Sequence, residues 1–261
     1  MTSFSPTQAD LLRGELDNLK RRNAGQQPIT NYFFQSLSKS VNLRMLTSER
    51  SLCFLYDEWD FSRFYFISFD LGDLEKLLHG MNWPPIVVLD WISKSGSTAV
   101  DSLMSNAGFH LHTIYDRIIC RDFRRERPEA PAQLAKAQEL ETIHCSLLQV
   151  FDKYADHIIT REELAELISQ QLVIVNRDPE GKIDGFVVFP ITGSTCNFNF
   201  LYNSGGSMRL VQLLGSFYGA LAERGVQSGF SWVRRTRPMV LKLHESFGWK
   251  TDGLVDYIYL R

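Results

Sequence analysis

The chain has 261 residues, of which 44% are hydrophobic and 22% charged, and its formal net charge is -2. This length suits one large domain or two small ones, and the composition is typical of a globular protein. A nearly neutral chain has no general attraction to nucleic acid or to an anionic membrane, and no apolar run is long enough to cross a bilayer. We therefore expect neither nucleic acid nor a membrane as a partner.

The cysteines and the first residues indicate the compartment. The four cysteines lie far apart and form no Cys-x-x-Cys pair; they are Cys53, Cys120, Cys145 and Cys196. This spacing argues against structural zinc and against a disulfide framework, and it favours free thiols. The opening MTSFSPTQADLLRGELDNLKRR contains no apolar segment before a cleavage site, so no secretory signal is expected. We expect a cytoplasmic protein without a metal.

The first half of the chain predicts alternating helices and strands. Leucines at helical spacing, with proline and glycine as punctuation, mark the helices, and runs rich in aromatic residues mark the strands. The expected helices cover residues 7–22, 28–37, 71–78 and 98–106. The expected strands cover residues 52–56, 61–69, a run beginning at 86, and 110–120.

A charged segment with two prolines, RDFRRERPEAPAQ from Arg121, predicts a linker to the second half. A long helix follows, with one apolar face from Leu140 to Tyr154, and Thr160 with Glu163 forms a capping box for the next helix. The remaining expected elements are a hairpin at 172–175 and 183–189, a strand at 196–202, an amphipathic helix ending at Gly225, a further strand, a short helix, and a last strand.

The two halves repeat one another. The segment NAGFHLHTIYDRIICR around residue 110 parallels SFGWKTDGLVDYIYLR at the end of the sequence. Gly108 pairs with Gly248 and Asp116 with Asp256, each at an offset of 140 residues. We interpret this as two similar α/β units in tandem, residues 1–125 and 134–261. The alternative is that any two strand–helix–strand units look alike.

The stretch from Phe198 to Arg261 organises the second half. An apolar strand leads into a turn with two glycines and an amphipathic helix, and a strand, a short helix ending in Gly-Trp and a final strand follow. This order resembles the acyl-CoA-binding core of the GNAT acyltransferase superfamily, and GWKTDGLVDYIYL is similar to its "GF…DG" ending. The resemblance implies an α/β (α+β) protein of two GNAT-like units, each a mixed, mainly antiparallel sheet flanked by helices, the C-terminal one the more intact. It also implies acyl transfer from acetyl-CoA or another acyl-CoA to an amine of a small molecule or a protein.

In the family, a loop of the form Gln/Arg-x-x-Gly-x-Gly/Ala leads into a helix whose free N–H groups bind the coenzyme A pyrophosphate. Gly205 and Gly206 fit this role, although the spacing differs and no Arg or Gln lies three residues before a glycine. An ordinary turn is the alternative, and Arg209 would contact phosphate or face solvent. The expected cosubstrate contacts are Leu201, Tyr202, Asn203, Ser204, Gly205, Gly206, Ser207, Met208, Arg209 and Arg237.

The tyrosine that commonly protonates the coenzyme A thiolate in the family is replaced here by His244, and the usual asparagine by Arg237. Histidine can donate a proton near neutral pH, so His244 is the expected catalytic acid; the alternative is a partly buried helix residue without a chemical role. For the general base, Asp184, Glu245 and water remain open.

Two further functions remain open at this point. The basic residues Arg234 to Arg237 would also suit an acyl carrier protein as the donor, and the altered motif positions would suit a non-catalytic ligand- or partner-binding module. The first half has no Gly-Gly loop between Phe69 and Pro84, and Met104 stands where the repeat has His244. We therefore expect one cosubstrate site per chain, in the second half.

Overall fold

The structure is a computed structural model that describes residues 5–31, 43–79, 81–94, 98–123 and 132–261. The chain forms two compact units. The first runs to Ile114 and includes Leu254–Arg261, and the second is Tyr115–Gly253. None of the described helices is long and apolar enough to cross a membrane.

The first unit contains a sheet with the strand order β1-β3-β4-β5-β6-β14. Neighbouring strands are antiparallel except β5 and β6, which are parallel. The strands of this unit are β1 (Ser5–Thr7), β2 (Ile29–Thr30), β3 (Leu43–Thr47), β4 (Ser51–Glu58), β5 (Phe61–Ser68), β6 (Val87–Ser93) and the end of β14 (Lys250–Leu260). Its helices are α1 (Ala9–Arg22), α2 (Leu71–Leu78) and α3 (Thr98–Asn106).

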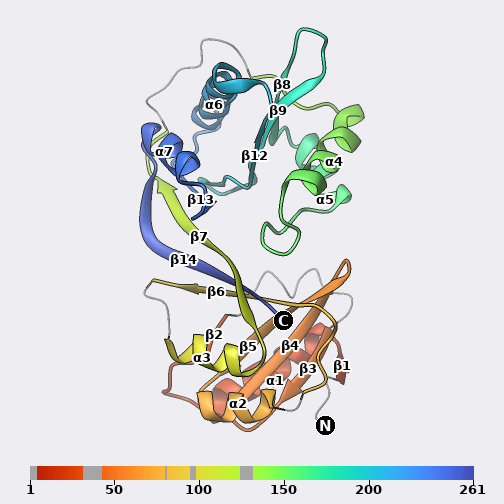
Figure 1. Ribbon diagram of the computed structural model, residues 1–261, viewed down its shortest axis with the longest axis vertical. Helices are drawn as coiled ribbons and strands as arrows, with labels where there is room; N and C mark the ends of the chain where they lie inside the picture. The colour runs from red at the N-terminus through yellow and green to blue at the C-terminus, as the bar shows by residue number, and fades with distance from the viewer. Residues whose placement is uncertain (1–4, 32–42, 80, 95–97, 124–131) are drawn as a thin grey trace. The chain divides into compact units, whose positions relative to one another are not determined.

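Both faces of this sheet are covered. Alternate side chains of β5 are buried against different helices: Phe64 and Phe66 pack with α2 and α3, whereas Tyr65 and Ile67 pack with α1. All eight residues of β5 are buried, because a strand between two helical layers has no face in water. The unit is therefore a helix–sheet–helix sandwich (Figure 1).

The second unit has the same layers. Its strands are the end of β7 (His110–Cys120), β8 (Val173–Arg177), β9 (Ile183–Val188), β10 (Ile191–Thr192), β11 (Thr195–Asn197), β12 (Phe200–Asn203), β13 (Ser228–Arg234) and the start of β14. Its helices are α4 (Leu140–Val150), α5 (Arg161–Ser169), α6 (Gly206–Glu223) and α7 (Pro238–Ser246), with a short 3-10 turn η2 (Ala137–Glu139). In Figure 1, α6 lies on one side of β9 and β12, and α4 and α5 lie on the other.

The repeated Gly-aromatic segments have the same local structure in both halves. Gly108 and Gly248 each follow a helix with a positive φ, +88° and +86°, which favours glycine. The next residue in each case, Phe109 or Trp249, is buried and donates its backbone N–H back into the helix, to Met104 or His244. The tandem arrangement predicted from the 140-residue offset therefore appears in matching helix ends.

The strand after each of these segments pairs with a strand from the other half of the sequence. Tyr115–Cys120 of β7 pairs with Gly229–Arg234 of β13, and Val255–Leu260 of β14 pairs with Val88–Ser93 of β6. The compact units consequently begin and end at residues other than the expected boundaries 1–125 and 134–261. The expected boundaries, which come from the repeat in the sequence, stay a prediction.

Most predicted elements form, with three differences. The helix expected from Pro28 is wrong at its start, because Ile29–Thr30 form strand β2; the rest of that helix, like most of the predicted linker, lies outside the described residues. The helix expected through Tyr154 ends at Val150, where Phe151 turns extended with ψ 151°. The single strand expected at 196–202 is two strands, β11 and β12, in different sheets.

A buried ion pair joins three strands of the first unit. Arg63 on β5 is 1% exposed and lies 3.0 Å from both Glu58 and Asp90. Burial lowers the pKa of Arg63, but the two carboxylates raise it overall, so the guanidinium is charged. Burial and the nearby Asp90 raise the pKa of Asp256 on β14 well above its usual range, and Arg63 acts in the opposite direction.

Replacing Arg63 by Met should destabilise the protein, because Glu58 and Asp90 would lose their buried cation. We expect a loss of roughly 3–5 kcal/mol in the free energy of unfolding, measured by urea denaturation at pH 7. Arg13→Met, which removes an exposed ion pair with Asp10, is the control and should cost at most about 1 kcal/mol. Equal effects of the two substitutions would contradict this account.

Candidate functional site

Two neighbouring strands of the second unit part from one another. Thr195–Asn197 of β11 pair in parallel with Ser228–Phe230 of β13, and the backbone N–H of Phe198 donates to Phe230 at 2.9 Å. From Asn199 onwards the chain turns to β9, so β12 pairs with β9 and not with β13. Within residues 132–261, no backbone hydrogen bond joins β12 to β13 beyond Phe198. The facing edges of these strands therefore keep unused backbone donors and acceptors.

The helix that follows β12 begins without a side-chain cap. Gly205 is the N-cap of α6, no side chain accepts from its first amides, and its first turn has no acidic residue. Such an end carries free N–H groups and a partial positive charge. The Oδ1 atom of Asn203, just before this turn, is buried and accepts no hydrogen bond. Gly206 has φ +83°, a conformation that favours glycine.

Arg209 has a structural partner. Its Nε and Nη2 donate to the two carboxylate oxygens of Asp184 at 2.8 and 3.1 Å, and Nη2 also donates to the carbonyl of Arg177. A Cβ atom on Gly205 would lie 2.5 Å from the Asp184 carboxylate, so this close packing requires glycine there. Arg209 and Asp184 are therefore held to one another, and the Arg209 side chain keeps 31% of its surface exposed.

The structure brings most of the other expected contacts together around the α6 turn. Leu201 and Tyr202 on β12 are half-buried, and Ser204, Ser207 and Met208 are exposed. Arg237 is the exposed N-cap of α7, and none of the described residues is its side-chain partner. Among the described residues, no cluster of His, Cys, Asp or Glu could hold a metal ion.

In the first unit, the corresponding strands β5 and β6 also part, but the chain fills the gap. They pair only at Ser62 and Arg63, and β2 pairs with β5 further along, at Ile67 and Ser68. Asn31, 3% exposed, then bridges the two strands. Its Nδ2 donates to the carbonyls of Phe64 and Asp90 at 2.9 and 3.1 Å, and its Oδ1 accepts from Phe66 N at 2.7 Å.

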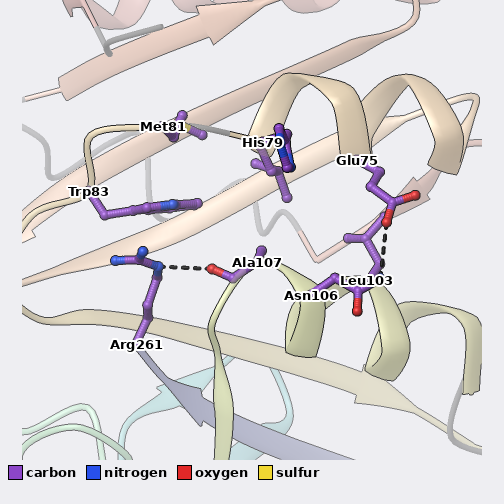
Figure 2. A pocket seen from close by; sticks show the side chains of 9 residues that line it. Glu75, His79, Met81, Trp83, Leu103, Asn106, Ala107 and Arg261 are labelled. Atoms are coloured by element: carbon purple, nitrogen blue, oxygen red, sulfur yellow. Dashed lines mark hydrogen bonds between the residues drawn. The ribbon is translucent and has the colours of Figure 1, made fainter. Parts of the chain in front are cut away.

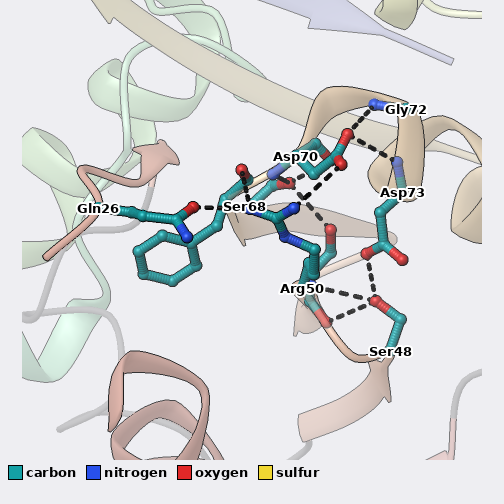
Figure 3. Close-up of polar contacts among 9 residues, drawn as sticks. Gln26, Ser48, Arg50, Ser68, Asp70, Gly72 and Asp73 are labelled. Carbon is teal, nitrogen blue, oxygen red and sulfur yellow. Dashed lines mark hydrogen bonds and ion pairs between the residues drawn. The ribbon is translucent and has the colours of Figure 1, made fainter. Parts of the chain in front are cut away.

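The helix after β5 is also capped by its own chain (Figure 3). The Oδ1 atom of Asp70 accepts from the backbone N–H groups of Gly72 and Asp73 at 2.9 and 3.3 Å. The other oxygen lies 3.5 Å from Nη1 of Arg50. A carboxylate therefore takes the place where an anion would bind at the start of α2. The sequence showed that this segment has no Gly-Gly loop, but it indicated neither the bridge made by Asn31 nor the cap made by Asp70.

His244 lies beside the point where β12 leaves β13. Its ring is 2% exposed and packs edge-on against Phe198 and Trp249, at centroid distances of 5.3 and 5.7 Å. Its Nδ1 is buried without a hydrogen-bond partner. Burial lowers the pKa of His244 to about 4, so the imidazole is neutral at pH 7. A neutral ring is a weak proton donor, and the role of His244 as catalytic acid stays a prediction.

A polar cluster that the sequence did not reveal ties the loop after α4 to β7 and β13. Tyr115 donates its hydroxyl to Asp156 at 2.6 Å, and Arg234 donates to the same hydroxyl at 2.9 Å and to Asp152 at 3.0 Å. Burial, with Asp156, raises the pKa of Tyr115. Arg235 is paired as well, with Asp116. The predicted basic run is thus largely neutralised by acids more than 75 residues away in the sequence.

Comparison with known proteins identifies the fold. No family model matches the chain, and no curated protein matches its sequence. Solved structures do resemble it. A GCN5-related N-acetyltransferase from Sphaerobacter thermophilus aligns with a TM-score of 0.59 at 13% identity, over 94% of this chain and 84% of that one. A tandem GNAT protein from the clavulanic acid biosynthesis pathway aligns with a TM-score of 0.57 at 11% identity, over 99% and 97% of the two chains.

A GCN5-related N-acetyltransferase from Kribbella flavida is also similar, with a TM-score of 0.53 at 11% identity, over 96% of this chain and 94% of that one. Identities this low establish the fold alone. The chain accordingly has the tandem GNAT fold, with a mainly antiparallel sheet flanked by helices, as its sequence predicted.

The environment of His244 predicts a pH dependence of stability. Unfolded, the imidazole binds a proton below its ordinary pKa of 6.5; folded, it does so only below about 4. The stabilisation is therefore complete above pH 6.5 and is lost as the pH falls towards 4, by about 2 kcal/mol at pH 5. Urea denaturation at pH 7 and pH 5 should show this loss in the wild type and not in His244→Phe.

The exposed His110 supplies the control for this measurement. His110→Gln should keep the pH dependence of the wild type, because the substitution leaves the buried His244 ring and its contacts with Phe198 and Trp249 in place. A His244→Phe protein that loses as much stability at pH 5 as the wild type would show that His244 is not the titrating group.

Proposed function

We propose that the second unit binds an acyl-CoA, acetyl-CoA being the simplest, and transfers its acyl group to an amine of a small molecule or a protein. The observation that carries this proposal is the parting of β12 and β13, whose facing edges keep unused backbone groups. The pantetheine arm of coenzyme A is extended and carries two amides, which suits such edges. In the first unit, Asn31 makes the equivalent hydrogen bonds from within the chain.

The start of α6 would hold the pyrophosphate. Its uncapped amides and the glycines at 205 and 206 favour an anion, and the exposed Arg237 supplies a cation at the start of α7. Arg209 acts indirectly in this proposal, because its pair with Asp184 fixes the turn. Ser204 anchors the same turn by donating its N–H and its hydroxyl to the carbonyl of Asp184.

In the proposed reaction, the amine nitrogen attacks the thioester carbonyl carbon; the C–N bond forms, the C–S bond breaks, and the thiolate takes a proton. Backbone N–H groups near Leu201 would polarise the carbonyl. His244 is the candidate acid by position alone, since its ring is neutral. As Asp184 is paired with Arg209, the exposed Glu245 and water are the remaining candidates for the base.

Coenzyme A is favoured over an acyl carrier protein as the donor. Acyl carrier proteins are recognised through acidic surfaces, and of the basic run that would meet them, Arg234 and Arg235 are already paired with acids. Arg237 and Lys242 remain exposed. Free cysteines among the described residues agree with a reducing compartment, and we propose the cytoplasm.

A second candidate function is binding without turnover. The buried, neutral His244 favours it, because a neutral imidazole is a weak proton donor to the leaving thiolate. Both candidate functions require coenzyme A binding, but only acyl transfer releases the free thiol of coenzyme A, so thiol release distinguishes them. Acetyl-CoA incubated with a panel of polyamines, amino acids and lysine peptides would release thiol at a rate that depends on the amine if the protein is an enzyme.

Calorimetry with acetyl-CoA should give one site per chain. Replacing both Gly205 and Gly206 by Leu should weaken binding at least about tenfold, equivalent to about 1.4 kcal/mol, because side chains would cover the α6 amides. Gly193→Leu is a matched control: Gly193 also has a positive φ, +60°, with open space around it, so it tests backbone strain alone. Two sites per chain, or unchanged affinity in the double variant, would contradict the proposal.

A further inference from the structure

The first unit contains a small pocket that the proposed reaction does not use (Figure 2). Its volume is about 240 Å³, and it lies between the ends of α2 and α3. Pockets for drug-sized ligands measure roughly 300–1,000 Å³, so this one suits a smaller molecule. All its lining residues belong to the first unit.

Arg261 forms one wall and is held in place from two sides. Its Nε donates to the carbonyl of Ala107 at 2.9 Å, and its guanidinium carbon lies 5.2 Å from the ring centroid of Trp83. The nearest neighbour that a Cβ atom on Gly108 would meet is this guanidinium, at 3.3 Å. The cation is therefore fixed before any ligand arrives, which reduces the entropy lost on binding.

The charge of Arg261 is not balanced by a carboxylate among the described residues. Burial lowers the pKa of Arg261, whereas the hydrogen bonds that Arg209 donates to Asp184 raise the pKa of Arg209. The Nη atoms of Arg261 make no hydrogen bond to the described residues. Two parallel N–H donors in a fixed plane match the two oxygens of a carboxylate.

The rest of the pocket has an apolar and an acidic part. Leu78, Met81 and Leu103 are buried and form its apolar surface. Glu75 lies across the pocket from Arg261, as Figure 2 shows. Its Oε1 accepts from Asn106 at 3.0 Å, which orients the carboxylate.

We infer that this pocket binds a free α-amino acid with an apolar side chain. Arg261 receives the carboxylate, the Leu78, Met81 and Leu103 surface receives the side chain, and Glu75 faces the ammonium group. Opposite charges at the two ends reject dicarboxylates and diamines, because either would place like charges together. This inference is independent of the proposed function, since no atom of the α6 turn takes part.

Three probes separate the parts of the site: L-leucine, L-leucinamide, which lacks the carboxylate, and 4-methylpentanoate, which lacks the ammonium. Calorimetry on the full chain should show binding of L-leucine and weaker binding of both analogues. The loss of a charge-assisted hydrogen bond corresponds to roughly ten- to hundredfold in affinity. The inference would be overturned if L-leucine did not bind, or if L-leucinamide bound with the same affinity as L-leucine. If 4-methylpentanoate bound with the affinity of L-leucine, the role of Glu75 would be overturned.

Two substitutions test the residues. Arg261→Gln should reduce leucine affinity by the same factor as removing the carboxylate and should not change leucinamide affinity. Ala107→Leu fills the pocket without removing the backbone acceptor of Arg261, so it provides a second test should Arg261→Gln disturb the end of α3. Arg22→Gln, at the exposed end of α1, is the control and should bind leucine normally. Leucine affinity unchanged in both pocket variants would place the ligand elsewhere.

Discussion

The need of a parted strand for hydrogen-bond partners explains the difference between the two units. In each, a parallel strand pair begins together and then separates, which leaves backbone donors and acceptors inside the protein. The first unit satisfies them internally, with β2 along β5 and the amide of Asn31 across to Asp90. The second leaves the edges of β12 and β13 without such an insertion. The first unit therefore has a closed, structural strand pair, whereas the strand pair of the second unit is a candidate binding site.

The helix starts follow the same division. Asp70 supplies a negative charge to the amides of α2, and the equivalent turn before α6 has glycine instead. A carboxylate fixed at a helix start and a phosphate that binds there are stabilised by the same free amides and the same dipole. Capping therefore stabilises α2 and at the same time removes it as an anion site. The glycines before α6 give up that stabilisation.

The exchanged final strands make the two repeats interdependent. β14 completes the sheet of the first unit, where Asp256 lies near the buried Arg63 pair, and β7 completes that of the second, where Tyr115 meets Arg234. Each of these clusters joins residues from both halves of the sequence. A chain cut in the linker would separate these partners, so neither half contains a complete unit.

Features that depend on residues close together in the chain could be predicted from the amino-acid sequence. Alternation and helical spacing gave most strands and helices, the Thr160–Glu163 capping box forms as written, and the constant offset between Gly108 and Gly248 indicated the tandem fold. These features reflect backbone preferences and side-chain periods that act within a few residues.

Contacts between side chains far apart in the sequence became known from the folded chain. Arg209 finds Asp184 at 25 residues' separation, Arg234 finds Tyr115 at 119, and Asn31 reaches Asp90 at 59. The protonation of His244 likewise depends on its burial beside Phe198 and Trp249. Ion pairing and burial depend on contacts between residues that are far apart in the sequence. The sequence therefore shows neither whether a run of arginines is paired with acids nor whether a histidine is protonated.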